Sequence, residues 1–174
     1  MSIGEYTVGL ARRKHIDMLP EIERAAAALF PEDVLPPEIR ADVIPEDELE
    51  AARREQRLWT AVTKAGSPVG FALVIHDPDS VFLQEIDVHP AHQRNGLGRR
   101  LIDEVISRAR ADEFSCITLT TFEHVAWNAP FYSRLGFRKL EAAELGKTLR
   151  ERLQAEMDAG LRQRVAMQLT LCNR

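Results

Sequence analysis

The segment from Val81 to Thr121 constrains the fold of this chain most, because it predicts a strand, a polar turn, a helix and a second strand in that order. Val81–Val88 and the β-branched run Cys116–Thr121 predict the two strands. Between them, Gly96–Ala111 predicts an amphipathic helix with its apolar residues on one stripe. That stripe comprises Leu97, Leu101, Ile102, Val105, Ile106 and Ala109. A helix that joins two strands in this way forms a right-handed crossover, so we expect the strands to be parallel.

Antiparallel strands are expected before the crossover, because short polar turns separate the strand-like segments there. The further strands expected are Tyr6–Arg12, Leu58–Lys64, Val69–His76, Phe137–Leu140 and Arg164–Leu171. The further helices expected are Ile16–Phe30, Pro45–Arg57, Trp127–Leu135 and Leu145–Gly160. Pro31–Pro45 is expected to be a proline-rich acidic loop that can include a short helical piece. This order predicts a mixed α/β sheet. A length of 174 residues with 45% hydrophobic composition fits a single domain over residues 1–174.

The balance of charge argues against one broad class of function. The chain has 27 acidic and 23 basic residues and a formal net charge of -4, whereas a general nucleic-acid binder normally has a basic excess. Cys116 and Cys172 lie in apolar runs and are expected to be reduced core residues, and no Cys/His cluster predicts a metal site. No signal peptide is visible, and the longest apolar run, Val69–Ile75, is too short to span a bilayer. We therefore expect a soluble cytoplasmic protein.

The turn Gln93-Arg94-Asn95-Gly96-Leu97-Gly98-Arg99 carries the strongest functional signal. The first N–H groups of a helix lack intrahelical acceptors, and the helix dipole favours an anion at that end. Gly96 and Gly98 have no Cβ, so a phosphate can approach the main chain closely. Arg94 and Arg99 add positive charge for the outer phosphates. The turn is therefore predicted to bind a pyrophosphate.

Other phosphate-binding motifs fit this turn less well. A P-loop needs Lys followed by Ser or Thr after the glycines, and neither follows here. The dinucleotide fingerprint needs a third glycine three residues after Gly98, where Leu101 stands. The alternative is that the glycines belong to an ordinary helix start that binds no ligand. The flanking strand, Gln93 and the arginines disfavour this alternative.

The motif Gln93-Arg94-Asn95-Gly96-Leu97-Gly98 resembles the Q/R-x-x-G-x-G/A sequence of the GCN5-related N-acetyltransferases. Glu85–Pro90 is similar to the strand that precedes this motif in the family, and Trp127–Phe137 is similar to a later family helix with Asn, Phe-Tyr and Gly-Phe. The resemblance is firm over roughly Val69–Leu140. It implies an α/β (α+β) fold with a mixed, mostly antiparallel sheet of about six or seven strands, a central parallel pair and about four flanking helices.

The resemblance also implies a cosubstrate, acetyl-coenzyme A (acetyl-CoA). In this family the pantetheine arm lies between two parallel strands, which correspond here to Val81–Val88 and Cys116–Thr121. The arm would hydrogen-bond to main-chain groups of Ile86 and Val88, as an added strand does, and to Asn128. The pyrophosphate would bind to the amides of the turn, which belong to Arg94, Asn95, Gly96, Leu97, Gly98 and Arg99.

Acetyl transfer needs a neutral amine, a stabilised oxyanion and a proton for the departing thiolate. Tyr132 matches the family tyrosine near the coenzyme sulfur and is the candidate acid, and a packed tyrosine is the alternative. Glu85 is the candidate base, and a solvated or salt-bridged strand residue is the alternative. Glu123 and His124 are rival bases, and some family members use no dedicated base. A main-chain N–H near Val88 would hold the oxyanion.

The leading hypothesis is an acetyl-CoA-dependent N-acetyltransferase that acts on the amine of a small molecule, amino acid or peptide by direct attack in a ternary complex. The alternative is a non-catalytic module that binds an acyl-CoA and regulates a partner. The acceptor is expected to contact Phe30–Pro45, Trp59, Phe122–Trp127 and Leu145–Gly160. The alternative for Trp59 and Trp127 is that they are core residues. No nucleic acid or membrane partner is expected, and Arg164–Leu171 is a candidate edge for pairing in a homodimer.

Overall fold

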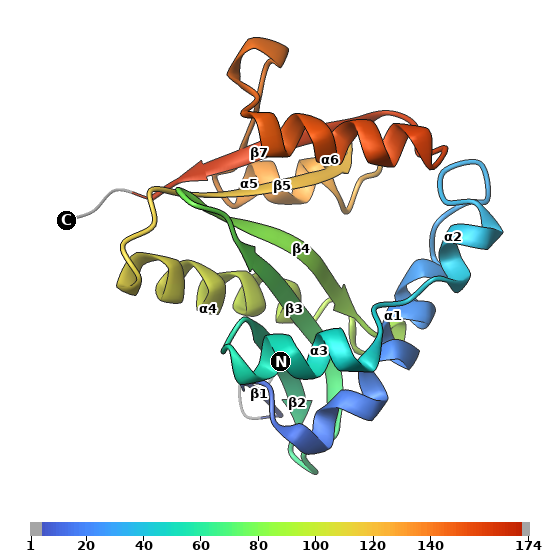
Figure 1. Ribbon diagram of the computed structural model, residues 1–174. Coiled ribbons are helices and arrows are strands. Elements are labelled where there is room, and N and C mark those ends of the chain that lie inside the picture. The colour runs from blue at the N-terminus through green and yellow to red at the C-terminus, as the bar shows by residue number, and fades with distance from the viewer. Residues whose placement is uncertain (1–4, 172–174) are drawn as a thin grey trace. The chain divides into compact units, whose positions relative to one another are not determined.

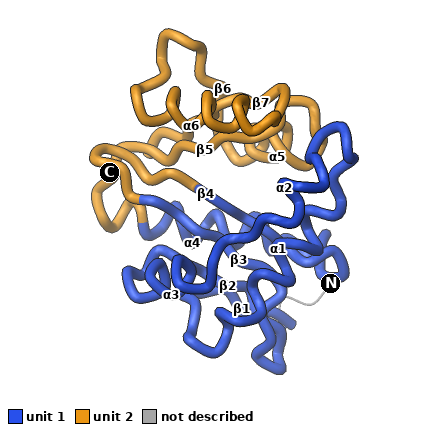
Figure 2. The backbone as a smooth tube through the Cα atoms, turned by 45° about the vertical axis from the view of Figure 1, so that its right-hand side comes forward, with its two compact units in different colours: residues 1–75, 84–108 blue, residues 76–83, 109–174 orange. Residues whose placement is uncertain are grey.

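The computed structural model describes residues 5–171, and Cys172 therefore lies outside the described residues. The chain divides into two compact units (Figure 2). The first unit comprises residues 1–75 and 84–108, and the second comprises residues 76–83 and 109–174. The expectation of a single domain stays a prediction.

Strands of the first unit follow the order β1-β2-β3-β4, and those of the second follow β4-β5-β7-β6, so that β4 belongs to both (Figure 1). Their bounds are β1 Tyr6–Leu10, β2 Leu58–Thr63, β3 Pro68–His76, β4 Ser80–Val88, β5 Cys116–Phe122, β6 Arg138–Lys139 and β7 Arg164–Thr170. The β4–β5 pair is parallel, and the pairs β1–β2, β2–β3, β5–β7 and β6–β7 are antiparallel. The predicted mixed, mostly antiparallel sheet with a parallel pair is confirmed.

Six α-helices are present within residues 5–171, compared with the about four that were expected to flank the sheet. Their bounds are α1 Leu19–Ala27, α2 Pro37–Ala41, α3 Glu46–Arg54, α4 Leu97–Ala111, α5 Ala129–Arg134 and α6 Lys147–Asp158. Three short 3-10 helices join them: η1 Arg13–Met18, η2 Pro90–His92 and η3 Ala142–Glu144. No helix within the described residues is long and apolar enough to cross a membrane.

The first predicted helix, Ile16–Phe30, is divided in the structure. Residues of η1 precede α1, and Pro20 lies in the first turn of α1. Proline has no N–H to donate, and it is tolerated in a first turn because those N–H groups have no intrahelical acceptor there. The sequence periodicity therefore predicted the apolar face of the helix correctly. The α-helix itself begins only at Leu19, which places Pro20 in its first turn.

The core of the first unit forms where η1, α1 and α3 pack on β2 and β3. Its members are Ala11, Ile16, Leu19, Ile22, Leu49, Ala52, Leu58, Phe71 and Leu73, all buried. Trp59 is also buried, with 3% of its surface exposed, so it is a core residue and not an acceptor contact. The α4 stripe is confirmed, because Leu97, Leu101, Ile102 and Val105 are each at most 2% exposed.

In the second unit, β5 is an interior strand. It pairs with β4 through Ser80↔Cys116, Val81↔Ile117 and Phe82↔Thr118, which confirms the predicted crossover. Its other neighbour is β7, and β6 pairs with the far side of β7. β6 pairs with only two residues of β7, Met167 and Gln168, so this side of β7 is partly covered, and pairing through Arg164–Leu171 in a homodimer stays a prediction. Cys116 is only half-buried, because it stands at the first position of β5, so the expectation of a core cysteine there is wrong.

Helix α6 is fixed to the second unit by two arginine–carboxylate pairs. Arg152 donates to both carboxylate oxygens of Asp77 at 2.6 and 2.9 Å, and its guanidinium lies 4.0 Å from the centre of the Phe82 ring. Arg164 of β7 makes two hydrogen bonds to the carboxylate of Glu156, at 2.8 and 3.0 Å. Bidentate pairs of this kind define one geometry, so they hold α6 beside β7 (Figure 1).

Candidate active site

The turn after β4 is held in place by polar side chains of its own sequence. The ring of His89 accepts a hydrogen bond from the N–H of Ala91 at 3.3 Å, which caps η2. The side-chain amide of Gln93 donates to the carbonyl of Val88 at 3.2 Å, so the turn is tied back to the end of β4. The Asn95 amide donates to the carbonyls of His92 and Gln93, at 3.0 and 3.2 Å. These bonds give the turn a defined conformation before any ligand binds.

Gly96 is placed where a ligand can reach the main chain. Its φ is 71°, in the left-handed region that glycine adopts without strain, and Arg94 also has a positive φ of 61°. A Cβ built on Gly96 would meet nothing within 4 Å, so the space beside this residue is open. Helix α4 starts at Leu97, and the first α-helical hydrogen bond of this turn runs from the Arg100 N–H to the Gly96 carbonyl at 3.0 Å. The amides from Leu97 to Arg99 come before Arg100, the first intrahelical donor, so they have no intrahelical acceptor and are available to an anion.

The arginines of this turn have different roles. Arg100 donates from its guanidinium to the carbonyl of Tyr6 at 3.1 Å, so it links α4 to β1 and does not serve the turn. Arg94 is exposed, and Arg99 makes a long ion pair of 3.7 Å with Asp103. Both Arg99 and Asp103 are more than half exposed, and such a pair is readily exchanged for another anion. Two cationic side chains thus accompany the open amides, and these residues fit a diphosphate.

The last part of β4 carries the two strand residues that sequence analysis assigned to the pantetheine arm. Ile86 and Val88 alternate with Glu85 and Asp87, so the two pairs point to opposite faces of the strand. A Cβ on Gly70 of β3 would lie 2.8 Å from the Asp87 carbonyl oxygen. Any residue other than glycine at position 70 would therefore clash with the main chain of β4. This contact fixes the main chain of β4 beside the turn.

Three carboxylates of the first unit interact electrostatically: Glu85 and Asp87 of β4, and Glu23 of α1. Burial is the largest cause and raises the pKa of Glu23 from its ordinary 4.5 to about 7, and the charge of Glu85 acts in the same direction. The N–H of Ile44 donates to Glu23 Oε2 at 3.0 Å, which opposes the rise. Burial, followed by the charges of Glu85 and Glu23, raises the pKa of Asp87 well above its ordinary value. Glu23 and Asp87 therefore lose their protons at a higher pH than ordinary carboxylates do.

The sequence pattern predicted Glu85 as a site residue, and Glu23 and Asp87 were not predicted. Both had a usable signal. Glu23 occupies the buried stripe of α1 together with Leu19, Ile22 and Ala26, where helical spacing calls for an apolar side chain. Asp87 lies two residues after Glu85 and so shares its face of the strand.

In the second unit, Asn128 and Tyr132 lie at the start and middle of α5. The carbonyl of Asn128 accepts from the N–H groups of Phe131 and Tyr132 at 2.8 and 3.1 Å, so Asn128 begins this helix. Tyr132 is 9% exposed, with the rings of Phe131 and Phe137 at 5.3 and 5.7 Å between centroids. Gly136 ends the helix with φ of 95°, as its position predicted. The tyrosine is thus held by aromatic packing.

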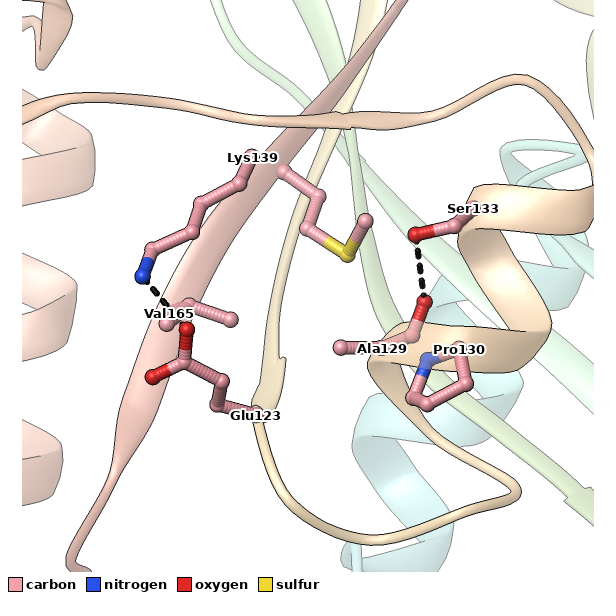
Figure 3. A pocket seen from close by; sticks show the side chains of 7 residues that line it. Glu123, Ala129, Pro130, Ser133, Lys139 and Val165 are labelled. Atoms are coloured by element: carbon pink, nitrogen blue, oxygen red, sulfur yellow. Dashed lines mark hydrogen bonds and ion pairs between the residues drawn. The ribbon is translucent and has the colours of Figure 1, made fainter.

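The rival bases have other surroundings. Glu123 forms an ion pair of 2.5 Å with Lys139, and Figure 3 shows this pair at one side of a hollow in the second unit. The Ser133 hydroxyl on the opposite side donates to its own helix, at the Ala129 carbonyl. The carboxylate of Glu123 is therefore committed to Lys139, and its role as a rival base stays a prediction. Trp127, which the sequence placed in an acceptor pocket or the core, is 52% exposed and lies outside the core.

The predicted site residues thus fall into two groups, one in each unit. The first unit holds Glu85, Ile86, Val88, Arg94, Asn95, Gly96, Leu97, Gly98 and Arg99. The second unit holds Asn128 and Tyr132. Within residues 5–171, no group of three or more His, Cys, Asp or Glu side chains is arranged to hold a metal ion. The carboxylates of Glu23, Glu85 and Asp87 therefore do not form a metal site.

Comparison with known proteins identifies a family and a fold. Residues 19–137 match the model of the acetyltransferase (GNAT) family, and this range includes the turn, Asn128 and Tyr132. Among solved structures, the chain is similar to the ribosomal-protein-S18-alanine N-acetyltransferase from Escherichia coli, with 20% identity and a TM-score of 0.67, covering 95% of this chain and 94% of that one. It is also similar to the PaiA N-acetyltransferase from Thermoplasma acidophilum in complex with coenzyme A, with 14% identity and a TM-score of 0.70, covering 98% and 99%.

A third similar structure is N-acetylglutamate synthase from Neisseria gonorrhoeae, complexed with coenzyme A and N-acetyl-glutamate. The identity is 17%, the TM-score is 0.73, and the match covers 96% of this chain. The chain spans only 35% of the length of that protein. At these identities the three structures establish a shared fold.

Proposed function

Because the chain belongs to the acetyltransferase (GNAT) family, we propose that it is an acetyl-CoA-dependent N-acetyltransferase that acetylates an amine by direct attack in a ternary complex. The observation that carries this proposal is the open glycine turn before α4. Its main-chain amides, the left-handed Gly96 and the exposed Arg94 together suit a diphosphate, which is the most charged part of coenzyme A apart from its 3′-phosphate. The similar structures solved with coenzyme A support the same choice of cosubstrate.

In this proposal the diphosphate binds to the amides between Arg94 and Arg99, with Asn95, Gly96, Leu97 and Gly98 between them. Arg99 exchanges its long contact with Asp103 for a phosphate oxygen. Main-chain groups of Ile86 and Val88 and the side chain of Asn128 bind the pantetheine arm. The side-chain amide of Gln93 already occupies one lone pair of the Val88 carbonyl, so Val88 has its N–H and the second lone pair to offer.

The chemical step joins the amine nitrogen to the acetyl carbonyl carbon and then breaks the carbon–sulfur bond. The amine must lose a proton and the thiolate must gain one. We assign the first proton to Glu85 and the second to the Tyr132 hydroxyl. Glu23 supports Glu85, because burial and the charge of Glu85 raise the pKa of Glu23 to about 7, where a carboxyl group can both accept and release a proton near neutral pH.

The acceptor in this proposal is a primary amine of a small molecule, amino acid or peptide. Similar structures include an enzyme named for a protein alanine and one bound to an acetylated amino acid. An amine is an ammonium ion in solution. The ionised carboxylate of Glu85 attracts this cation, and the ammonium gives one proton to water before the neutral nitrogen attacks. This attraction favours a cationic amine over a hydroxyl acceptor.

Isothermal titration calorimetry with acetyl-CoA tests the proposal. Gly96→Glu places a bulky anion in the open space of the turn and forces a non-glycine residue to φ of 71°, so we expect acetyl-CoA affinity to fall by at least about tenfold, or about 1.4 kcal/mol. Gly146→Glu is the matched control, because Gly146 begins α6, has an ordinary φ of -62° and also has open space around its Cβ position. Equal affinity in wild type and Gly96→Glu would show that the diphosphate binds elsewhere.

Turnover separates this enzyme from a binding module that only senses acyl-CoA. Release of free coenzyme A thiol is measured against a panel of amines, with Glu85→Gln and wild type compared at equal concentration. Thiol release that depends on an amine and falls in Glu85→Gln supports the assignment. Tight binding of acetyl-CoA without turnover across the panel would favour the sensor.

A further inference from the structure

A buried threonine of β5 determines how Asn128 faces a ligand. Thr121 is 2% exposed, and its hydroxyl donates to Oδ1 of Asn128 at 2.7 Å. We propose that Thr121 is a positioning residue for the cosubstrate: it fixes the Asn128 side-chain amide so that its NH2 group donates to a carbonyl of the pantetheine arm. This inference rests on the proposed function, and it concerns a residue that neither sequence motif contains.

The main chain of Asn128 is already immobilised on both sides. Its N–H donates to the Val125 carbonyl at 2.9 Å, and its carbonyl receives the two N–H groups that begin α5. The remaining freedom of the residue lies in its side-chain torsions. A terminal amide torsion is broad and roughly two-fold, so without a partner the oxygen and the NH2 group exchange places easily.

The Thr121 hydroxyl removes that ambiguity. The hydroxyl is buried, and a buried hydroxyl without an acceptor is costly, so Oδ1 is held toward β5. The two ends of an amide point in different directions, and the NH2 group consequently points away from Thr121. A group with only N–H donors recognises an acceptor, and the two amide carbonyls of pantetheine are acceptors of that kind.

The threonine also links two elements that the sequence separates. Thr121 is near the end of β5, and Asn128 precedes α5 after an exposed loop that contains Glu123, His124 and Trp127. The hydrogen bond therefore positions the side chain of Asn128 relative to the rigid strand and not to the loop. We expect the loss of this bond to weaken binding of the arm while the fold of α5 is retained.

Calorimetric titrations with two ligands test this role. Coenzyme A contains the pantetheine arm, and 3′-phosphoadenosine 5′-diphosphate carries the same nucleotide and diphosphate without it. Thr121→Val keeps the shape of the side chain and removes the hydroxyl, and we expect about a 5- to 20-fold loss of coenzyme A affinity with unchanged nucleotide affinity. Thr121→Ser restores the hydroxyl and should restore most of the affinity.

Thr118→Val is the matched control, because Thr118 is a buried threonine on the same strand, 7% exposed. It should leave both affinities unchanged. In an Asn128→Ala background, Thr121→Val should have no further effect on coenzyme A, since the side chain that it positions is gone.

The outcomes distinguish this inference from the proposed function. Failure of wild type to bind either ligand would refute the function itself. Wild-type binding of coenzyme A that Thr121→Val leaves unchanged would overturn the role of Thr121 alone. A loss that affects both ligands equally, or that persists in Thr121→Ser and in the Asn128→Ala background, would also overturn it, because it would indicate a structural role.

Discussion

Replacing Glu23 with glutamine should make this protein more stable at alkaline pH. The carboxylate of Glu23 has a pKa raised from 4.5 to about 7, chiefly by burial, so the folded state holds its proton more tightly than the unfolded chain does. The contribution of Glu23 to the free energy of unfolding must then be greatest below pH 4.5. It falls as the pH rises from 4.5 to about 7 and is constant above about 7. Glu23→Gln removes this titration and keeps an oxygen that can accept from the Ile44 N–H.

The size of the effect follows from the two pKa values. A difference from 4.5 to about 7 corresponds to a penalty of at most about 3 kcal/mol on the folded state at pH 8. Partial solvation of the carboxylate lowers this figure, and we expect Glu23→Gln to gain about 1–2 kcal/mol over wild type at pH 8. At pH 5 the gain should be much smaller, under about 1 kcal/mol, because this pH lies just above the ordinary pKa of 4.5 and most of the penalty develops between pH 5 and 7.

Urea denaturation at several pH values between 5 and 8 measures this gain directly. Glu21→Gln is the control, since Glu21 lies on the exposed side of the same helix and makes only a long contact of 3.8 Å with Arg24. That variant should follow the wild-type curve. Parallel pH profiles for wild type and Glu23→Gln would refute the reasoning, because they would show that Glu23 carries no raised pKa.

Two further predictions concern stability, in addition to those for cosubstrate binding. Gly70→Ala should destabilise the protein by about 1–3 kcal/mol in thermal unfolding, since its Cβ would lie 2.8 Å from a main-chain oxygen of β4, whereas Gly146→Ala should be tolerated because its Cβ position is open. Arg164→Leu should cost about 1–3 kcal/mol in urea denaturation, because it leaves the partly buried carboxylate of Glu156 without its bidentate partner. Lys147→Leu, which breaks an exposed pair of 3.8 Å on the same helix α6, should change stability by less than about 0.5 kcal/mol, and equal effects of the two substitutions would contradict this ranking.

Much of the fold could be predicted from sequence because it depends on local pattern. The order of strands, the amphipathic α4 and the parallel crossover follow from hydrophobic periodicity and from the handedness of strand–helix–strand connections. The open glycine turn before α4, for which we propose diphosphate binding, was also predictable, because its glycines and exposed arginines lie within a few residues of one another.

The helices, the strands and the open turn before α4 follow from the sequence, since each arises from neighbours along the chain. Which distant side chains act together depends on how these elements pack in three dimensions. Glu23 and Asp87 are 64 residues apart, and their shared effect on proton binding exists only because α1 packs near β4. Thr121 similarly contacts Asn128 only because the chain folds back after β5. This brings the Thr121 hydroxyl to 2.7 Å from Oδ1 of Asn128. Burial and hydrogen-bond geometry are properties of packed elements, so no local pattern could specify them.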